Sequence, residues 1–283
     1  MPVQSQSSII EALLRLTRTA NVIILVLAQY AAAFFLLKKQ IFTDWRLFVF
    51  SASAALIAAG GYVINDYYDV KIDLINNPNR VVIGRTVPRR VAILIHALLS
   101  GLGIFLGLFL GWKILAINIF SVGLLWWYSA ALKRLPFVGN LAVALLTGLS
   151  IAALNALYNS TDALVFIYAF FAFFITLIRE IIKDMEDLKG DGTYGCKTLP
   201  IIWGIRKTKT LLIILIGLLG VTVTITNFIF HRLDFIYLVM LLLIPLAWLI
   251  SRLVVADTKK DFGWLSSFCK VIILLGILSM ALI

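Results

Sequence analysis

Apolar runs of about 20 residues recur along the whole chain, and they constrain its fold more than any other feature. The hydrocarbon core of a bilayer is about 30 Å thick, so a helix that crosses it needs about 20 mostly apolar residues. Only 14% of the 283 residues are charged, compared with roughly 25% in an average soluble domain. The sequence therefore predicts an all-α membrane protein in which residues 1–283 form a single transmembrane domain.

Nine membrane-spanning helices are expected, with ends defined to within about 2–4 residues. The predicted spans are residues 20–37, 45–64, 91–111, 114–132, 138–157, 163–180, 210–230, 234–252 and 264–283. Several of these runs are close to the minimum length for a span, so eight or ten helices also agree with the sequence. Two long polar connections, residues 65–90 and 181–209, separate the spans.

Lysine and arginine are distributed unevenly over the predicted loops. Of the 25 basic residues, 19 fall on the side of the N-terminus, five fall on the other side, and Lys270 lies within the last span. Cytoplasmic loops carry such an excess, so the N-terminus and both long connections are predicted to be cytoplasmic in a multi-pass cell-membrane protein. This placement accounts for the net charge of +11 without a nucleic-acid partner.

The first acidic cluster follows the second span. Asn65, Asp69 and Asp73 are spaced four apart, so on a helix they share one stripe. Carboxylate and amide oxygens are hard ligands that suit Mg²⁺, which also binds substrate phosphates. Asp66 lies off this stripe and is the weaker candidate. The sequence therefore predicts that the three aligned residues help to hold Mg²⁺.

The second acidic cluster follows the sixth span, on the same side of the membrane. Asp184, Asp187 and Asp191 also share one face of a helix, whereas Glu186 points away from it. Two carboxylate stripes at the mouth of one helical bundle can bind two Mg²⁺ ions, which can grip a diphosphate and neutralise its charge as it leaves. The pair of clusters predicts a diphosphate-bearing substrate.

The two clusters resemble the motifs of the UbiA family of intramembrane prenyltransferases, N-x-x-x-D-x-x-x-D after the second span and D-x-x-D-x-x-x-D after the sixth. The resemblance implies nine helices around a central cavity and Mg²⁺-dependent transfer of a prenyl group from its diphosphate to a lipophilic acceptor. Residues 65–85 and 179–200 are most similar to the branch that transfers geranylgeranyl groups to geranylgeranylglyceryl phosphate. One departure concerns the acceptor: Val81 to Gly84 stand where the family often has proline and a Pro-Ser-Gly turn.

Further polar side chains are candidates for contacts with the substrates. Three basic residues are predicted to supply catalytic counter-charge: Arg80, Lys133 and Lys183. Seven more are predicted to bind substrate: Arg18, Asn21, Arg85, Tyr128, Asn140, Arg179 and Lys197. Guanidinium groups bind phosphate in bidentate fashion, which favours the arginines. Charges that orient the protein, interfacial aromatic residues and local salt bridges are the competing interpretations of these positions.

Two other functions agree with parts of the pattern. A prenyltransferase for aromatic acceptors, such as precursors of quinones, haem or chlorophyll, would use the same acidic clusters. A cation-coupled transporter would also need buried acids, but transporters keep their ion sites near the membrane midplane at broken helices. Here the acids lie at the ends of spans. The expected partners are a prenyl diphosphate donor, a lipophilic acceptor and the lipid bilayer, without an obligate protein partner.

Overall fold

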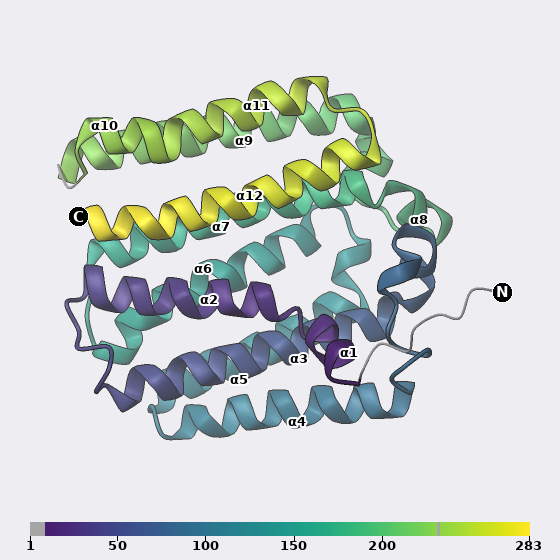
Figure 1. Ribbon diagram of the computed structural model, residues 1–283, viewed down its shortest axis with the longest axis horizontal. Helices are drawn as coiled ribbons and strands as arrows, with labels where there is room; N and C mark the ends of the chain where they lie inside the picture. The colour runs from purple at the N-terminus through teal and green to yellow at the C-terminus, as the bar shows by residue number, and fades with distance from the viewer. Residues whose placement is uncertain (1–8, 231–232) are drawn as a thin grey trace.

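The structure is a computed structural model that describes residues 9–230 and 233–283. Within these ranges the chain is almost entirely helical, and its long helices run side by side in stacked layers (Figure 1). Nine of them are long and apolar enough to cross a membrane, which confirms the predicted fold class. These spans are α2 with its π-helical continuation (Thr19–Leu36), α3 (Trp45–Asn76), α4 (Arg89–Leu108), α5 (Trp112–Ala130), α6 (Val138–Tyr158), α7 (Ala163–Glu186), α9 (Leu199–Phe230), α10 to α11 (Phe235–Val255) and α12 with its last 3₁₀ turn (Lys259–Leu282).

Four predicted boundaries are wrong. Helix α7 ends at Glu186 rather than near residue 180, and α12 begins at Lys259 rather than near residue 264. The two larger errors concern the polar connections. Helix α3 continues to Asn76 rather than ending near residue 64. The polar segment stays helical because it contains no glycine or proline between Gly61 and Pro78. Helix α9 begins at Leu199 rather than near residue 210, with a kink at Gly204, whose φ is 79°. Much of both connections is therefore helix.

Short elements complete one end of the bundle. They are α1 (Ile9–Leu16), the 3₁₀ turns η2 (Pro78–Arg80) and η3 (Leu132–Arg134), and α8 (Leu188–Thr193). Figure 1 shows α8 at one end of the bundle and the C-terminus at the other. Because both acidic motifs lie near α8, the chain gathers them at a single end of the molecule.

Helix α7 is the most deeply packed of the spans. Its buried side chains join two apolar clusters, one with α9, α11 and α12 and the other with α2, α3 and α6. A third cluster packs α1 against α3 and α4. The second acidic motif begins on α7 with Asp184. Its first carboxylate therefore lies on a helix that packs against other helices on several sides.

Small and polar residues bring α3, α4 and α5 close together within the spans. Ser53 donates a hydrogen bond of 2.7 Å to the carbonyl of Gly103, and Asn118 donates to the same carbonyl at 3.1 Å and to Ser53 Oγ at 2.8 Å. A Cβ atom on Gly103 would lie 2.5 Å from the Ile57 side chain. Such close contacts and interhelical hydrogen bonds are typical of membrane helices, which have little hydrophobic driving force to pack.

Candidate active site

A polar pocket lies where α3 and α7 end. Its walls come from the start of α2, from α3, α5, α6, α7 and α8, and from the turn η3. The lining residues are Arg18, Asn65, Asp69, Ile72, Asp73, Asn76, Tyr128, Lys133, Gly139, Asn140, Glu180, Lys183, Asp184, Asp187, Asp191 and Cys196. All six predicted metal ligands therefore line one pocket.

The first motif keeps the geometry that its spacing predicts, because α3 is a continuous helix through residue 76. The pocket is lined by Asn65, Asp69 and Asp73, which share a face. Lys133 of η3 contacts this motif: its Nζ lies 2.6 Å from Asp69 Oδ1 and 3.3 Å from Asn65 Oδ1. A largely buried lysine thus balances part of the negative charge of this motif.

The second motif does not lie on one continuous helix, so the predicted single stripe is wrong in its local geometry. Asp184 belongs to α7, Asp187 stands at the break with φ −93° and ψ 6°, and Asp191 belongs to the short helix α8. At the break, Asn76 of α3 bonds the carbonyl of Asp187 and the amide of Gly190, so a tertiary contact accompanies the change of direction. The break turns α8 against α3, so all three carboxylates still face the pocket.

Two neighbouring polar groups fix the orientation of pocket side chains. Asn140 Nδ2 donates a hydrogen bond of 2.9 Å to Asp184 Oδ2. Arg18 pairs with Asp66 at 2.8 Å, and its guanidinium carbon lies 4.9 Å from the centre of the Tyr62 ring. Asp66 itself does not line the pocket. Asp66, which lies off the stripe of the first motif, therefore holds Arg18 at the pocket wall.

Several predicted substrate residues lie outside the pocket. Arg85 donates to the carbonyl of Pro78 at 2.9 Å and so closes its own loop. Arg179 pairs with its neighbour Glu180, and Lys197 is exposed. Asn21 is half-buried on α2 without lining the pocket. The side chain of Arg80, at the end of η2, lies outside the described part of the structure.

Five residues that line the pocket are not predicted by the sequence: Ile72, Asn76, Gly139, Glu180 and Cys196. Two of them, Asn76 and Glu180, extend the polar motifs. Asn76 follows Asp73 by three positions and Glu180 precedes Asp184 by four, so each lies on the face of a motif. That spacing was the available signal for both. Asn76 contacts the second motif across the pocket, a tertiary contact that spacing alone does not reveal.

Burial dominates the electrostatics of the pocket. It raises the pKa of Asp191 to about 7, and the charges of Asp187 and Asp69 add to this shift. Burial also raises the pKa of Asp187, against the opposing effect of Lys183. For Lys133, burial lowers the pKa more than the charge of Asp69 raises it. Six acidic side chains and three basic ones line the pocket, so its acids outnumber its cations.

The donor set suits Mg²⁺ by two criteria. Its oxygens are carboxylates and an amide, and Asp187 Oδ1 is buried without a hydrogen-bond partner. Among the described residues, no three Asp, Glu, His or Cys side chains are already grouped as a metal site. Mg²⁺ commonly binds through one or two carboxylates together with substrate phosphates and waters, so such a preformed cage is not needed.

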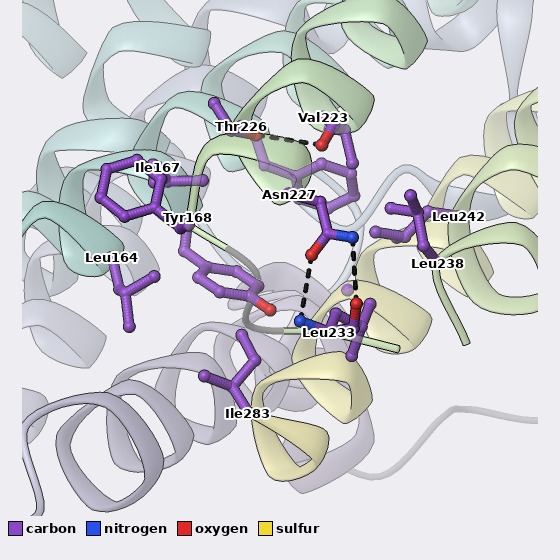
Figure 2. A pocket seen from close by; sticks show the side chains of 13 residues that line it. Leu164, Ile167, Tyr168, Val223, Thr226, Asn227, Leu233, Leu238, Leu242 and Ile283 are labelled. Atoms are coloured by element: carbon purple, nitrogen blue, oxygen red, sulfur yellow. Dashed lines mark hydrogen bonds between the residues drawn. The ribbon is translucent and has the colours of Figure 1, made fainter. Parts of the chain in front are cut away.

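A second pocket lies between α7, α9 and α12 and is lined mainly by apolar side chains (Figure 2). Its polar groups already have partners: Asn227 bonds the backbone of Leu233 twice at 3.0 Å, and Tyr168 Oη lies 2.8 Å from Ser279 Oγ. Phe171 of this pocket and Glu180 of the polar pocket are nine residues apart on α7 and so face opposite ways. The two pockets are separate.

Comparison with known proteins agrees with this architecture. The profile of the UbiA prenyltransferase family matches residues 25–273. The chain belongs to the UbiA prenyltransferase family. It is 34% identical to digeranylgeranylglyceryl phosphate synthase of Saccharolobus solfataricus over 96% of each chain. It is 31% identical to the enzyme of the same name from Methanosphaera stadtmanae over 84% of this chain and 88% of the relative.

Solved structures share the fold. A structure described as giving insights into digeranylgeranylglyceryl phosphate synthase in membranes superposes with a TM-score of 0.70 at 24% identity, covering 96% of this chain and 98% of the other. A UbiA homologue from Archaeoglobus fulgidus, bound to DMAPP and Mg²⁺, has a TM-score of 0.70 at 19% identity over 96% and 99% of the two chains. This UbiA member is thus a multi-pass membrane protein and a prenyltransferase, and the transporter interpretation is set aside.

Proposed function

We propose that the chain transfers a geranylgeranyl group from its diphosphate to geranylgeranylglyceryl phosphate, with Mg²⁺. The observation that carries the donor half of this proposal is the meeting of both acidic motifs in one pocket. The acceptor is supported by the relatives named digeranylgeranylglyceryl phosphate synthase, one of which matches nearly the whole chain.

We assign the metal to the two motifs. The proposed ligands are Asn65, Asp69, Asp73, Asp184, Asp187 and Asp191. When bound, Mg²⁺ neutralises the diphosphate and stabilises the charge that develops on it as it leaves. The Archaeoglobus fulgidus homologue of the same fold was solved with DMAPP and Mg²⁺, which agrees with this choice of metal.

The basic residues of the pocket bind the phosphates of the donor. Lys133, Lys183 and Arg18 line the pocket beside the carboxylates, and we include Arg80 from the adjoining turn. Their charges act inside a buried site, where electrostatic interactions are stronger than in water. Groups fixed toward developing charge in this way are usually the largest contribution to catalysis. We propose no substrate contact for Asn21, Arg85, Arg179 or Lys197.

The reaction breaks the bond between the allylic carbon and the diphosphate oxygen and joins that carbon to a hydroxyl oxygen of the acceptor, which loses its proton. Tyr128 contributes an aromatic ring to the pocket wall, and aromatic faces attract cationic centres. The pocket lies among packed helices, which limits the access of water to the reactive donor. Asn140 keeps Asp184 oriented through its hydrogen bond.

The acceptor decides between this proposal and an aromatic prenyltransferase. Purified protein in vesicles is supplied with labelled geranylgeranyl diphosphate, Mg²⁺ and either geranylgeranylglyceryl phosphate or 4-hydroxybenzoate, and extracted lipids are analysed by mass spectrometry. A diether phosphate product is expected from the glyceryl acceptor. Preferential labelling of the aromatic acceptor would contradict the proposed acceptor while keeping the prenyl transfer chemistry.

A further inference from the structure

Asn76 links the two acidic motifs through both polar atoms of its side chain. It is the last residue of α3, three positions after Asp73. Its Nδ2 donates a hydrogen bond of 3.1 Å to the carbonyl of Asp187, and its Oδ1 accepts one of 2.9 Å from the amide of Gly190. These partners lie at the break between α7 and α8, so one amide group spans the two motifs.

The surroundings of Asn76 leave little freedom to this contact. Its side chain is buried, and a Cβ atom on Gly190 would lie 2.4 Å from Asn76 Nδ2 and 2.6 Å from its Oδ1. The missing side chain of Gly190 therefore permits the approach. Lys259, at the start of α12, donates to the backbone carbonyl of Asn76 and ties the same point to a third helix.

We propose that Asn76 is a positioning residue that sets the separation of the two acidic motifs and thereby the affinity of the pocket for a divalent cation. The inference rests on the proposed assignment of these motifs to Mg²⁺. Carboxylates in the two motifs repel each other across the pocket, and a tie between their segments opposes that repulsion. An amide provides the tie without adding charge.

Removing the side chain has a defined local consequence. Without Asn76, the buried amide of Gly190 and the carbonyl of Asp187 each lose a hydrogen-bond partner. The segment carrying Asp187 and Asp191 is then free to move away from α3. Groups that orient metal ligands typically change metal affinity by about 10- to 100-fold when they are mutated. A loss of this size is expected for the divalent cation.

The test measures cation binding directly, using Mn²⁺ as the probe. Electron paramagnetic resonance gives the Mn²⁺ dissociation constant of detergent-solubilised full-length protein, and prenyl transfer is measured against Mg²⁺ concentration in parallel. Asn76→Ala is expected to raise the Mn²⁺ dissociation constant at least about tenfold. The Mg²⁺ concentration that gives half-maximal transfer should rise by a similar factor. At saturating Mg²⁺, the variant should regain most of the wild-type rate. Asn79→Ala, at an exposed asparagine of the next turn, is the matched control.

Gly190→Ala disrupts the contact from the other side and keeps the Asn76 side chain. It is expected to weaken Mn²⁺ binding as well, because its Cβ displaces the amide. The double variant Asn76→Ala with Gly190→Ala removes this clash, so its Mn²⁺ affinity should be no lower than that of Asn76→Ala alone. Such non-additivity is the signature of two residues acting through one contact.

Several outcomes would overturn the proposal. The first is an unchanged Mn²⁺ affinity in Asn76→Ala, even if the melting temperature of that variant falls. The second is a loss of Mn²⁺ affinity in Asn79→Ala equal to that in Asn76→Ala. The third is a loss of Mn²⁺ affinity in the double variant equal to the sum of the two single losses. The proposed reaction is tested separately. Wild-type protein that binds Mn²⁺ but does not prenylate the glyceryl acceptor would refute that acceptor and leave the role of Asn76 standing.

Discussion

Asp187 shows how a single residue can be placed for metal binding at a cost to the metal-free protein. One of its carboxylate oxygens is buried without a partner, and its charge is opposed mainly by Lys183 and Lys259. A buried group without a hydrogen bond destabilises the folded chain. We interpret this cost as the consequence of keeping an oxygen available for a cation.

Asp187→Asn should separate stability from activity. The amide removes a negative charge from a crowded pocket, so the melting temperature without Mg²⁺ is expected to stay the same or rise. Prenyl transfer is expected to fall about 10²- to 10³-fold, the range seen when a group that stabilises transition-state charge is removed. Thermal unfolding in detergent and transfer of labelled geranylgeranyl groups measure the two effects.

Glu186→Gln is the matched control for this substitution. Glu186 is adjacent in sequence but packs against Gly263 of α12 and does not line the pocket. Transfer within a few-fold of the wild type is expected. Loss of activity equal to that of Asp187→Asn would show that any change of charge near the break is harmful, and the assignment of Asp187 as a ligand would lose its support.

The raised pKa of Asp191 predicts that activation by Mg²⁺ depends on pH. Burial and the charges of Asp187 and Asp69 raise its pKa to about 7. Below that pH a proton must leave before the carboxylate can bind a cation, so the Mg²⁺ requirement should rise as pH falls from 8 to 6. For a single proton the limiting change is about tenfold per pH unit. A Mg²⁺ requirement that is independent of pH would contradict this prediction.

The same pKa predicts how stability responds to pH without metal. The folded chain keeps the Asp191 proton up to about pH 7, whereas an unfolded aspartate loses it near pH 3.9. The contribution of Asp191 to stability therefore falls as pH rises between these values and changes little above them. The rise in melting temperature caused by Mg²⁺ should accordingly be larger at pH 8 than at pH 6.

Helix packing makes a prediction at the scale of the element. Gly103→Ala would place a Cβ atom 2.5 Å from the Ile57 side chain and 3.1 Å from the carbonyl of Ser53. Separation of α3 from α4 should destabilise the protein by about 1–3 kcal/mol, as overpacking typically does. A Cβ atom on Gly101 of the same helix would meet no neighbouring atom within 4 Å. Gly101→Ala should therefore leave the melting temperature unchanged or raise it, and equal losses in both variants would contradict this packing.

The two motifs differ in how far the sequence predicts their geometry. Asn65, Asp69 and Asp73 lie on a helix without a breaking residue, so their spacing alone gives the shared face. The second motif breaks at Asp187, where α8 turns to meet Asn76. Residue spacing describes one helix and contains no information about a contact with another. Residue spacing therefore predicts the geometry of the first motif correctly. For the second motif it identifies the residues but not their arrangement.

At the scale of the whole molecule, the number of spans and the end at which the acids gather follow from hydropathy and charge. The contacts of the arginine and lysine side chains in the loops do not follow from hydropathy and charge. Arg85 and Lys197 were predicted in the site because positive charge near the motifs suits phosphate, but Arg85 bonds its own loop and Lys197 is exposed. A long flexible side chain reaches several partners from one backbone position, and tertiary contacts decide among them.

The orientation of the bundle is the remaining prediction at this scale, because the excess of basic residues places the polar pocket on the cytoplasmic side. Thr193 on α8 and Thr161 between α6 and α7 are exposed and lie at opposite ends of the bundle. In intact cells, a membrane-impermeant thiol reagent should label Thr161→Cys, whereas Thr193→Cys should react only after permeabilisation. The native Cys196 and Cys269 are buried, which keeps the background low. Labelling of Thr193→Cys alone in intact cells would reverse the orientation and place the pocket outside the cytoplasm.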